Sequence, residues 1–219
     1  MGETGDMQLT HLGHSCVLIE TTNQRVLIDP GNFSTAWHGV RDLDAILVTH
    51  QHGDHADPQQ LPALVAANPG AVLAVERGVP GLVSLPDSTR LLGPGETIDL
   101  GSLQVTTIGG EHAVIHRDYP SIGNIGFVFR APGEPSVLHP GDSLTAWADA
   151  IDIVLVPAFG PWAAVKETIE FCRAVGAGQG FLIHEGLLNE LGQALISRHV
   201  GALTPTRLVD VRDTRPWRP

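Results

Sequence analysis

Residues 49–58 read "THQHGDHADP" and gather three histidines and two aspartates within a single short segment. They follow the apolar run "DAILV" (44–48), which has the length and continuity of a strand that is covered on both faces. Folding alone gives a surface loop no reason to concentrate such side chains. Imidazole and carboxylate groups are ligands that zinc, iron and manganese accept. The segment therefore predicts a metal site at the end of a buried strand.

The spacing within this segment divides its side chains into two pairs. His50 and His52 lie two positions apart at a strand end, so both can point to one side of the chain. Gly53 allows a sharp backbone turn, after which Asp54 and His55 can point to a neighbouring spot. The segment thus supplies two half-sites that need ligands from elsewhere. Three candidates, each at the end of a later apolar run, are His112, Asp142 and His184.

The bulk composition is that of a globular, acidic protein. The 219 residues are 42% hydrophobic and 17% charged, and the formal net charge is −11, so no nucleic-acid partner is expected. No apolar stretch approaches the roughly 20 residues needed to cross a bilayer. The start "MGETGD" has neither the basic and apolar regions of a signal peptide nor the Ser or Thr of a myristoylation site. We therefore expect a cytoplasmic protein without a membrane partner.

Two cysteines, Cys16 and Cys172, lie in apolar surroundings. They are expected to be buried free thiols in a reducing compartment rather than a disulfide.

Strand and helix patterns are distributed over both halves of the chain. Helices are expected over 57–68, from Pro161 to 175 with Trp162 on the apolar stripe, and over 187–200. Strand patterns fall at 7–13, 16–22, 25–30, 44–50, 71–75, 96–100, 103–109, 125–130, 136–142, 152–158, 178–185 and 206–211. Two strand-rich halves, each with helices, favour two sheets packed together with helices outside, in one domain spanning residues 1–219.

The HxHxDH segment, followed in order by the three remote candidates, resembles the metallo-β-lactamase-fold hydrolases. The resemblance extends over nearly the whole chain, through "HLGHSCVLIE" (11–20), "LIDPG" (27–31), "HPGDS" (139–143) and "IHEG" (183–186). It is closest to the small hydrolases related to ascorbate-6-phosphate lactonase. The fold that it implies is α/β, a four-layered α/β/β/α sandwich.

The same resemblance implies two divalent metal ions, for which Zn(II) is favoured and Mn(II) or iron also suits the donor set. The implied ligands are His50, His52 and His112 for the first ion, Asp54, His55 and His184 for the second, and Asp142 as a bridge. Two such ions about 3.5–4 Å apart can make hydroxide available near neutral pH. The expected reaction is hydrolysis of an ester, lactone or phosphodiester bond in a small-molecule substrate.

Several other polar residues are candidates for supporting roles. Asp54 can also orient the nucleophile, and His116, in the loop after His112, is the candidate for protonating the leaving group. His14 is expected either to face the pocket or to be structural. Asp29 is expected either to support a ligating imidazole, as carboxylates often do, or simply to form a turn.

Alternative functions stay open at this point. A phosphodiesterase or nuclease of the RNA-processing type is disfavoured by the acidic charge. A mononuclear iron persulfide dioxygenase shares HxHxDH but holds one metal, so counting metals would separate it. A non-catalytic scaffold is disfavoured by the intact ligand set. The substrate is not fixed by the sequence, although Trp37, His38 and Tyr119 are candidates for the pocket wall, and a homo-oligomer is compatible with it.

Overall fold

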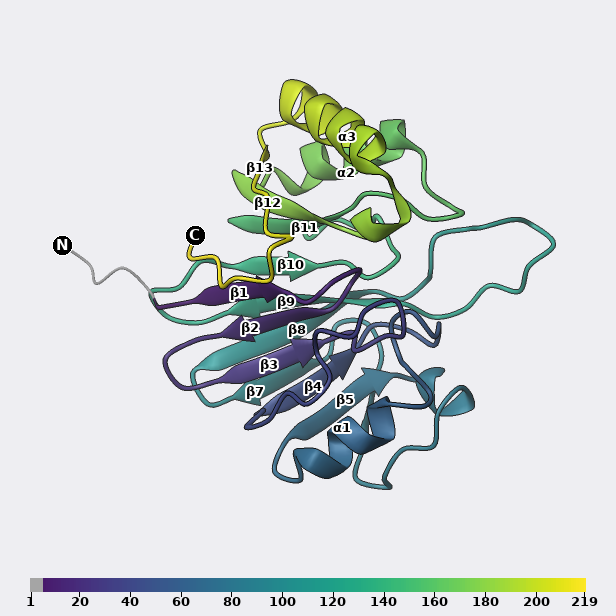
Figure 1. Cartoon of the computed structure of the whole chain (residues 1–219), viewed down its shortest axis with the longest axis vertical. Helices are drawn as coiled ribbons and strands as arrows, with labels where there is room; N and C mark the ends of the chain where they lie inside the picture. Colours follow the sequence, from purple (N-terminus) through teal and green to yellow (C-terminus); the bar gives the residue numbers. More distant parts are fainter. Residues whose placement is uncertain (1–5) are drawn as a thin grey trace.

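The computed structural model describes residues 6–219, and two β-sheets packed face to face form its centre (Figure 1). In spatial order the strands of the first sheet are β1 (Gln8–His11), β2 (Val17–Glu20), β3 (Arg25–Ile28), β4 (Ala45–Val48), β5 (Val72–Glu76) and β6 (Arg90–Leu92). This sheet is antiparallel from β1 to β3 and parallel from β3 to β6. All four residues of β4 are buried, as its continuous apolar run predicts.

The second sheet is built from the rest of the chain. In spatial order its strands are β13 (Arg207–Leu208), β12 (Gln179–Ile183), β11 (Ile153–Pro157), β10 (Val137–His139), β9 (Ile125–Arg130), β8 (Leu103–Gly109) and β7 (Thr97–Leu100). The sheet is antiparallel from β7 to β10 and parallel from β10 to β13.

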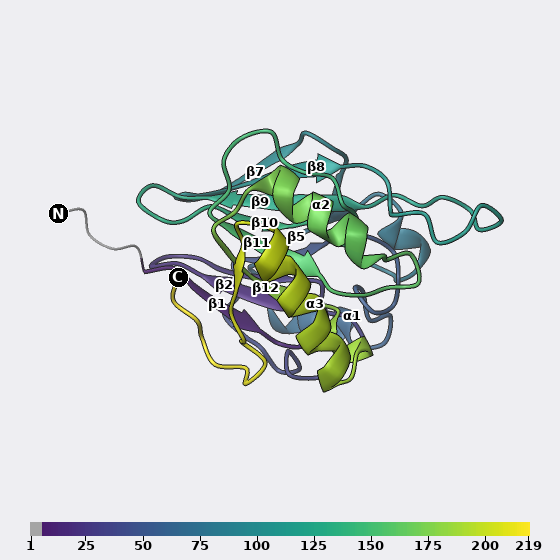
Figure 2. The same ribbon diagram turned by 90° about the horizontal axis from the view of Figure 1, so that it is seen from above.

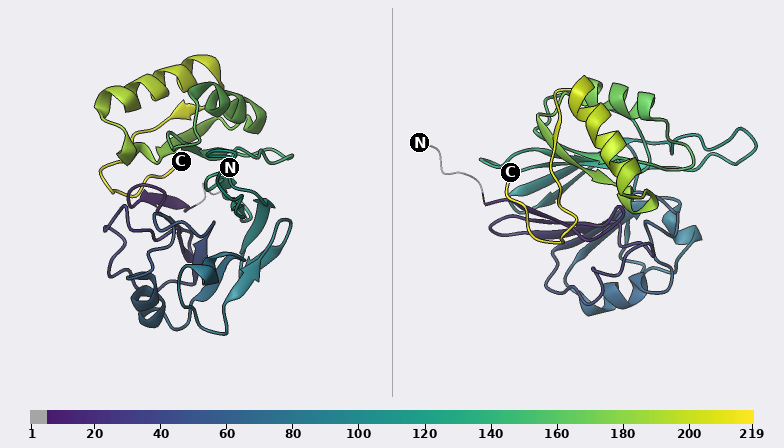
Figure 3. Two further views of the ribbon diagram at one scale, coloured as in Figure 1. Left: turned by 90° about the vertical axis from the view of Figure 1, so that its right-hand side faces the viewer. Right: turned by 45° about the horizontal axis from the view of Figure 1, so that its top comes forward.

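Helices cover the outer face of each sheet. The first sheet carries α1 (Leu61–Ala67), and the second carries α2 (Val165–Val175) and α3 (Glu190–Leu203) (Figures 2 and 3). Two short 3₁₀ turns, η1 (Val79–Gly81) and η2 (Glu185–Leu187), complete the elements.

Three apolar clusters fill the spaces between these layers. The central cluster joins the two sheets, with Leu47 on one side and Phe127 on the other. A second cluster packs β4 against Leu61 of α1, and a third packs β11 against Phe171 of α2 and Val200 of α3. Side chains alternate between the two faces of each strand, which is why one strand can serve two clusters. The α/β/β/α sandwich is therefore confirmed, while the extent of the single domain stays a prediction.

The three largest differences between the observed and the expected elements concern α2, α1 and β6. The helix expected from Pro161 begins only at Val165, because Trp162 lies in the preceding turn and its indole points toward Asp142. The helix expected from residue 57 begins at Leu61. The Asp57 carboxylate accepts hydrogen bonds from the backbone amides of Gln59 and Gln60, which precede the helix. Strand β6 was not predicted.

Within residues 6–219 no helix is long and apolar enough to cross a membrane. Both cysteines are buried and free, as predicted. The segment "MGETGD", for which no signal peptide or lipid site is expected, lies almost wholly outside the described residues.

Candidate metal centre

The loops that follow several strand ends meet at one edge of the sandwich. His50 lies two residues beyond β4, and His112, Asp142 and His184 follow β8, β10 and β12. Since the carboxyl ends of parallel strands share an edge, β10 and β12 deliver their polar residues to the same place, where α/β sheets commonly bind ligands. The sequence-distant candidates are thereby brought together.

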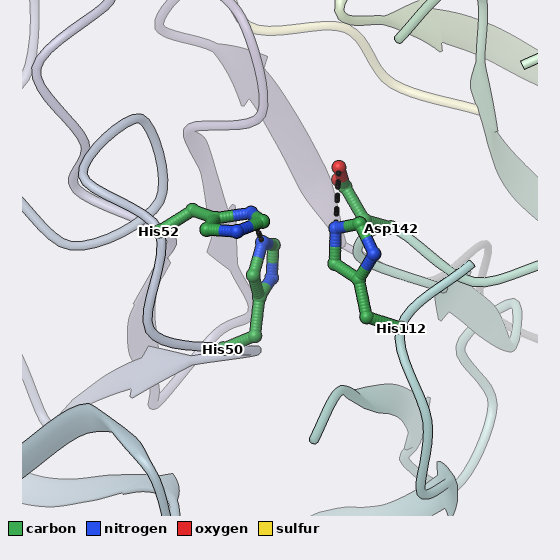
Figure 4. Close-up of side chains that lie close together, drawn as sticks. All are labelled: His50, His52, His112 and Asp142. Carbon is green, nitrogen blue, oxygen red and sulfur yellow. Dashed lines mark hydrogen bonds and ion pairs between the residues drawn. The ribbon is translucent and has the colours of Figure 1, made fainter. Parts of the chain in front are cut away.

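One group of side chains joins the two sheets. Donor atoms of His50, His52, His112 and Asp142 all lie within 4.8 Å of one another. Figure 4 shows these side chains pointing toward a common space. Nε2 of His50 is 3.1 Å from Nδ1 of His52, and Nε2 of His112 is 3.2 Å from Oδ2 of Asp142. These four residues could hold one cation.

A second group lies beside the first and shares Asp142 with it. Oδ1 of Asp142 is 3.0 Å from Nε2 of His55 and 3.1 Å from Nε2 of His184. Its other oxygen faces His112, so the carboxylate directs one oxygen to each group. This is the arrangement expected of a bridging ligand.

Asp54 and His14 lie together at the second group. Oδ2 of Asp54 is 3.7 Å from Nε2 of His55, and Nε2 of His14 donates to it at 2.9 Å. The His14 ring stacks on His184, with centroids 4.4 Å apart, and its donor atom lies within 4.8 Å of those of His55 and His184. A nitrogen that donates to Asp54 cannot bind a metal at the same time, so this geometry favours His14 as a support for Asp54. Ligation by Asp54 itself stays a prediction.

Several of the donor atoms are free to accept a cation. Nδ1 of His112 donates to the carbonyl of Ala113 at 2.6 Å, and Nδ1 of His184 donates to that of Phe159 at 3.0 Å, which leaves each Nε2 with a lone pair. In the part of the chain that the structure describes, four buried atoms here have no hydrogen-bond partner: Nε2 of His55, His112 and His184, and Oδ1 of Asp142. Such burial is costly, and one metal ion at each of the two groups would satisfy all four.

Asp29 supports His55 from the opposite side of the ring. Its fully buried carboxylate lies 2.7 Å from Nδ1 of His55 and accepts hydrogen bonds from the backbone amide and hydroxyl of Thr49 and from the hydroxyl of Ser15. Of the two readings left open by the sequence, the structure therefore supports the one in which Asp29 orients an imidazole.

His50, His184 and Asp142 carry the protonation that metal binding requires. Burial lowers the pKa of His50 well below its ordinary value and lowers that of His184 to about 4, so both rings are neutral near pH 7. Burial opposes ionisation of Asp142, yet His184 and His55 hold its pKa well below the usual range. At His55, burial lowers the pKa, but Asp142 and Asp29 outweigh it and raise the pKa. In the metal-free centre the two carboxylates therefore favour a proton on His55, which a metal ion bound there would displace.

A pocket of about 270 Å³ opens beside His52 and His112. Its other wall is formed by residues 113–122, part of the teal loop that extends from the body in Figures 1 and 2. His116 and Tyr119 line it, and Tyr119 is 67% exposed. Trp37 and His38 instead line a separate pocket beside α1, so the suggestion that they line this one is wrong. The role of His116 as an acid stays a prediction.

Two residues that hold Asp142 are not among the site residues that the sequence predicts. Nε1 of Trp162 donates to Oδ2 of Asp142 at 2.8 Å, and Oδ1 of Asn124 accepts from the Asp142 backbone amide at 3.0 Å. Neither residue belongs to a spacing pattern that marks a ligand. The one available signal is that Asn124, although polar, directly precedes the buried strand β9.

Comparisons with known proteins identify the family and the fold. The family model described as a beta-lactamase superfamily domain matches residues 8–179. Protein Rv0786c of Mycobacterium tuberculosis is 39% identical over 183 residues, which cover 83% of this chain and 85% of that protein. A UPF0173 metal-dependent hydrolase of Xanthobacter autotrophicus is 31% identical over 63% of this chain and 62% of its own length, which is less than two thirds. The solved structure of the metallo-beta-lactamase fold protein YhfI from Bacillus subtilis has a TM-score of 0.70 at 16% identity, covering 96% of this chain and 98% of that one.

Proposed function

Because the chain belongs to the beta-lactamase superfamily and has the metallo-β-lactamase fold, we propose that it is a binuclear metal-dependent hydrolase. Its substrate would be a small molecule with an ester, lactone or phosphodiester bond. The proposal rests mainly on the Asp142 carboxylate, which directs one oxygen to each of two groups of imidazoles. Among residues 6–219, the buried Nε2 atoms of His55, His112 and His184 in these groups have no hydrogen-bond partner.

The first cation would be held by His50, His52 and His112, the second by Asp54, His55 and His184, with Asp142 shared. When bound, two such cations supply Lewis acidity and lower the pKa of water. Zinc is our favoured metal, and manganese or iron would also fit the nitrogen and oxygen donors.

The protein's own residues would orient the reactants and move protons. Burial opposes ionisation of Asp54, but its hydrogen bond from His14 and the nearby His55 lower its pKa to about 2, so it is an anion near pH 7. An ionised carboxylate held by His14 can accept a hydrogen bond from the attacking water and fix its direction. His116, on the pocket wall, would donate the proton to the leaving group.

The pocket supports the choice of a small substrate. Its volume of about 270 Å³ is below the range typical of drug-sized ligand sites. The exposed side chains of Val114 and Tyr119 offer apolar contact beside the reacting centre. The net charge of −11 argues against a nucleic-acid substrate. The buried free thiols suit a reducing compartment, and we place the protein in the cytoplasm.

A metal analysis and a substrate panel would test the proposal. Protein purified without chelator should contain two metal ions per chain, and the panel should pair lactones, thioesters and phosphodiesters with zinc, manganese or iron. Activity should be confined to one bond class and be lost in Asp54→Ala but kept in Asp99→Ala, an exposed aspartate on β7. A single iron per chain with oxygen consumption on a persulfide would instead identify the dioxygenase reaction.

A further inference from the structure

Trp162 supports the proposed bridging carboxylate through its indole N–H. It lies in the turn between β11 and α2, is 8% exposed, and donates from Nε1 to Oδ2 of Asp142 at 2.8 Å. Its ring meets His112 edge-on at a centroid distance of 6.3 Å and meets His184 in the same manner at 6.5 Å. Trp162 therefore contacts the bridge and lies beside one imidazole of each half-site.

The hydrogen bond makes the two carboxylate oxygens unequal. Oδ2, which faces His112, also accepts from Trp162. Oδ1, which faces His55 and His184, has no hydrogen-bond partner among the described residues. The terminal torsion of an aspartate is soft and roughly two-fold. A donor that binds one oxygen only therefore selects one rotation of the carboxylate over the others.

The local backbone is built to bring the indole to this position. A Cβ on Gly160 would lie 2.7 Å from Nε1 of Trp162, so glycine leaves the space that the indole needs. The turn is closed by a hydrogen bond from the amide of Ala163 to the carbonyl of Gly160 at 2.9 Å. The carbonyl of Phe159 accepts from Nδ1 of His184. One short turn thus orients both a bridging carboxylate and an imidazole.

We infer that Trp162 is a positioning residue that fixes the rotation of Asp142 and makes the metal position of His50, His52 and His112 depend on it. This inference rests on the proposed function, since it needs two cations at the centre. Hydrogen bonds to ligating carboxylates hold them in place, and their loss typically weakens metal binding roughly 10- to 100-fold. The position facing Oδ2 should lose this support, whereas the position facing Oδ1 should not.

A cobalt titration of the metal-free protein tests this directly. Wild type should show two binding events by calorimetry and by visible absorption, and His112→Ala should abolish the one that belongs to the first position. Trp162→Phe, which keeps an aromatic ring but lacks the N–H, should weaken that same event roughly 10-fold or more and leave the other unchanged. Trp147→Phe is the matched control, because the Trp147 N–H is buried without a hydrogen-bond partner in the described chain.

A second variant separates positioning from packing. Gly160→Ala keeps the indole but displaces it from Asp142, so it should reproduce the selective weakening of the first binding event. If both cobalt-binding events were unchanged in Trp162→Phe and Gly160→Ala, or if both events weakened equally, this inference would be overturned and the proposed function would stand. A wild-type protein that binds fewer than two cobalt ions would overturn the proposed function and this inference with it.

Discussion

At the scale of single residues, the centre depends on the hydrogen bonds of one buried carboxylate, that of Asp29. Asp29 accepts hydrogen bonds from Ser15 and Thr49 and faces Nδ1 of His55 at 2.7 Å. It is completely buried, so any loss of these partners leaves polar groups without compensation. The position of His55, a proposed ligand, therefore depends on Asp29.

Asp29→Asn should weaken both metal binding and folding. The amide presents hydrogens to groups that are themselves donors, which costs about 1–3 kcal/mol of stability, and metal affinity should fall roughly 10- to 100-fold. Urea unfolding of the metal-free protein and a zinc titration measure the two effects. Asp99→Asn, on an exposed position of β7, is the control. Equal zinc affinity in the two variants would contradict the role given to Asp29.

The two cysteines should be inert toward thiol reagents in the native protein. Burial raises the pKa of Cys172 to about 12, and burial together with the nearby charge of Asp29 raises that of Cys16 well above its ordinary value. A raised pKa means that the thiolate, the reactive form, is scarce at about pH 8. Reaction with a chromogenic disulfide should be roughly 100-fold or more slower than in guanidinium, where both thiols react. Rapid native labelling of either cysteine would show that its surroundings open.

The residues of the centre that the sequence predicts are those with a local or strand-end signal. His50, His52, Asp54 and His55 share one segment, and His112, Asp142 and His184 each end an apolar run, so the structure brings all of them to one edge. The contact of Trp162 with Asp142 could not be predicted in this way. It depends on the turn before α2, and the apolar pattern of the sequence instead assigns Trp162 to the helix. His14 matched the resemblance, but its contact with Asp54 is set by tertiary packing.

At the scale of elements, the loop that carries HxHxDH is held by the segment after β3. The amide of Asn32 donates to the carbonyl of Gly53, and that of Asp57 donates to the carbonyl of Pro30. Gly31 lies between these bonds, where an added Cβ would overlap the backbone carbonyl of Asp54. Two loops from different strand ends therefore touch backbone to backbone.

Gly31→Ala should push these loops apart. We expect the free energy of unfolding to fall by about 3 kcal/mol, at the upper end of what overpacking costs. Zinc binding should also weaken, because Asp54 and His55 must shift. Gly70→Ala is the control, since a Cβ there meets nothing within 4 Å. Denaturant unfolding of the two metal-free variants gives the comparison. A Gly31→Ala protein as stable as Gly70→Ala would show that the contact is not tight.

The strands were more predictable than the helix ends. A short, continuous apolar run such as the one in β4 is typical of a strand that is covered on both faces, so the sequence alone indicates it. The start of α2 was placed too early because periodicity cannot distinguish a buried indole on a helix from one in the turn before it. Strand β6 was missed because two of its three residues are exposed, which leaves no alternation to detect.

At the scale of the whole molecule, metal loading should raise stability. A ligand that binds the folded state at about 100 times its dissociation constant contributes roughly 2.7 kcal/mol, which for a chain of this size is about 5–10 °C in Tm. Differential scanning fluorimetry of chelator-treated protein, before and after zinc, manganese or iron is restored, measures the shift. Identical Tm values with and without every metal would contradict the proposed centre.

The division of the proposed ligands between the sheets has a mechanical consequence. His50, His52, Asp54 and His55 follow a strand of the first sheet, and the remaining three follow strands of the second. Neither sheet alone completes a coordination sphere, so bound cations would cross-link the two sheets at one edge. Opening of the sandwich at that edge and release of the ions would then be a single event, and amide hydrogen exchange in β4 and β12 should slow together on loading.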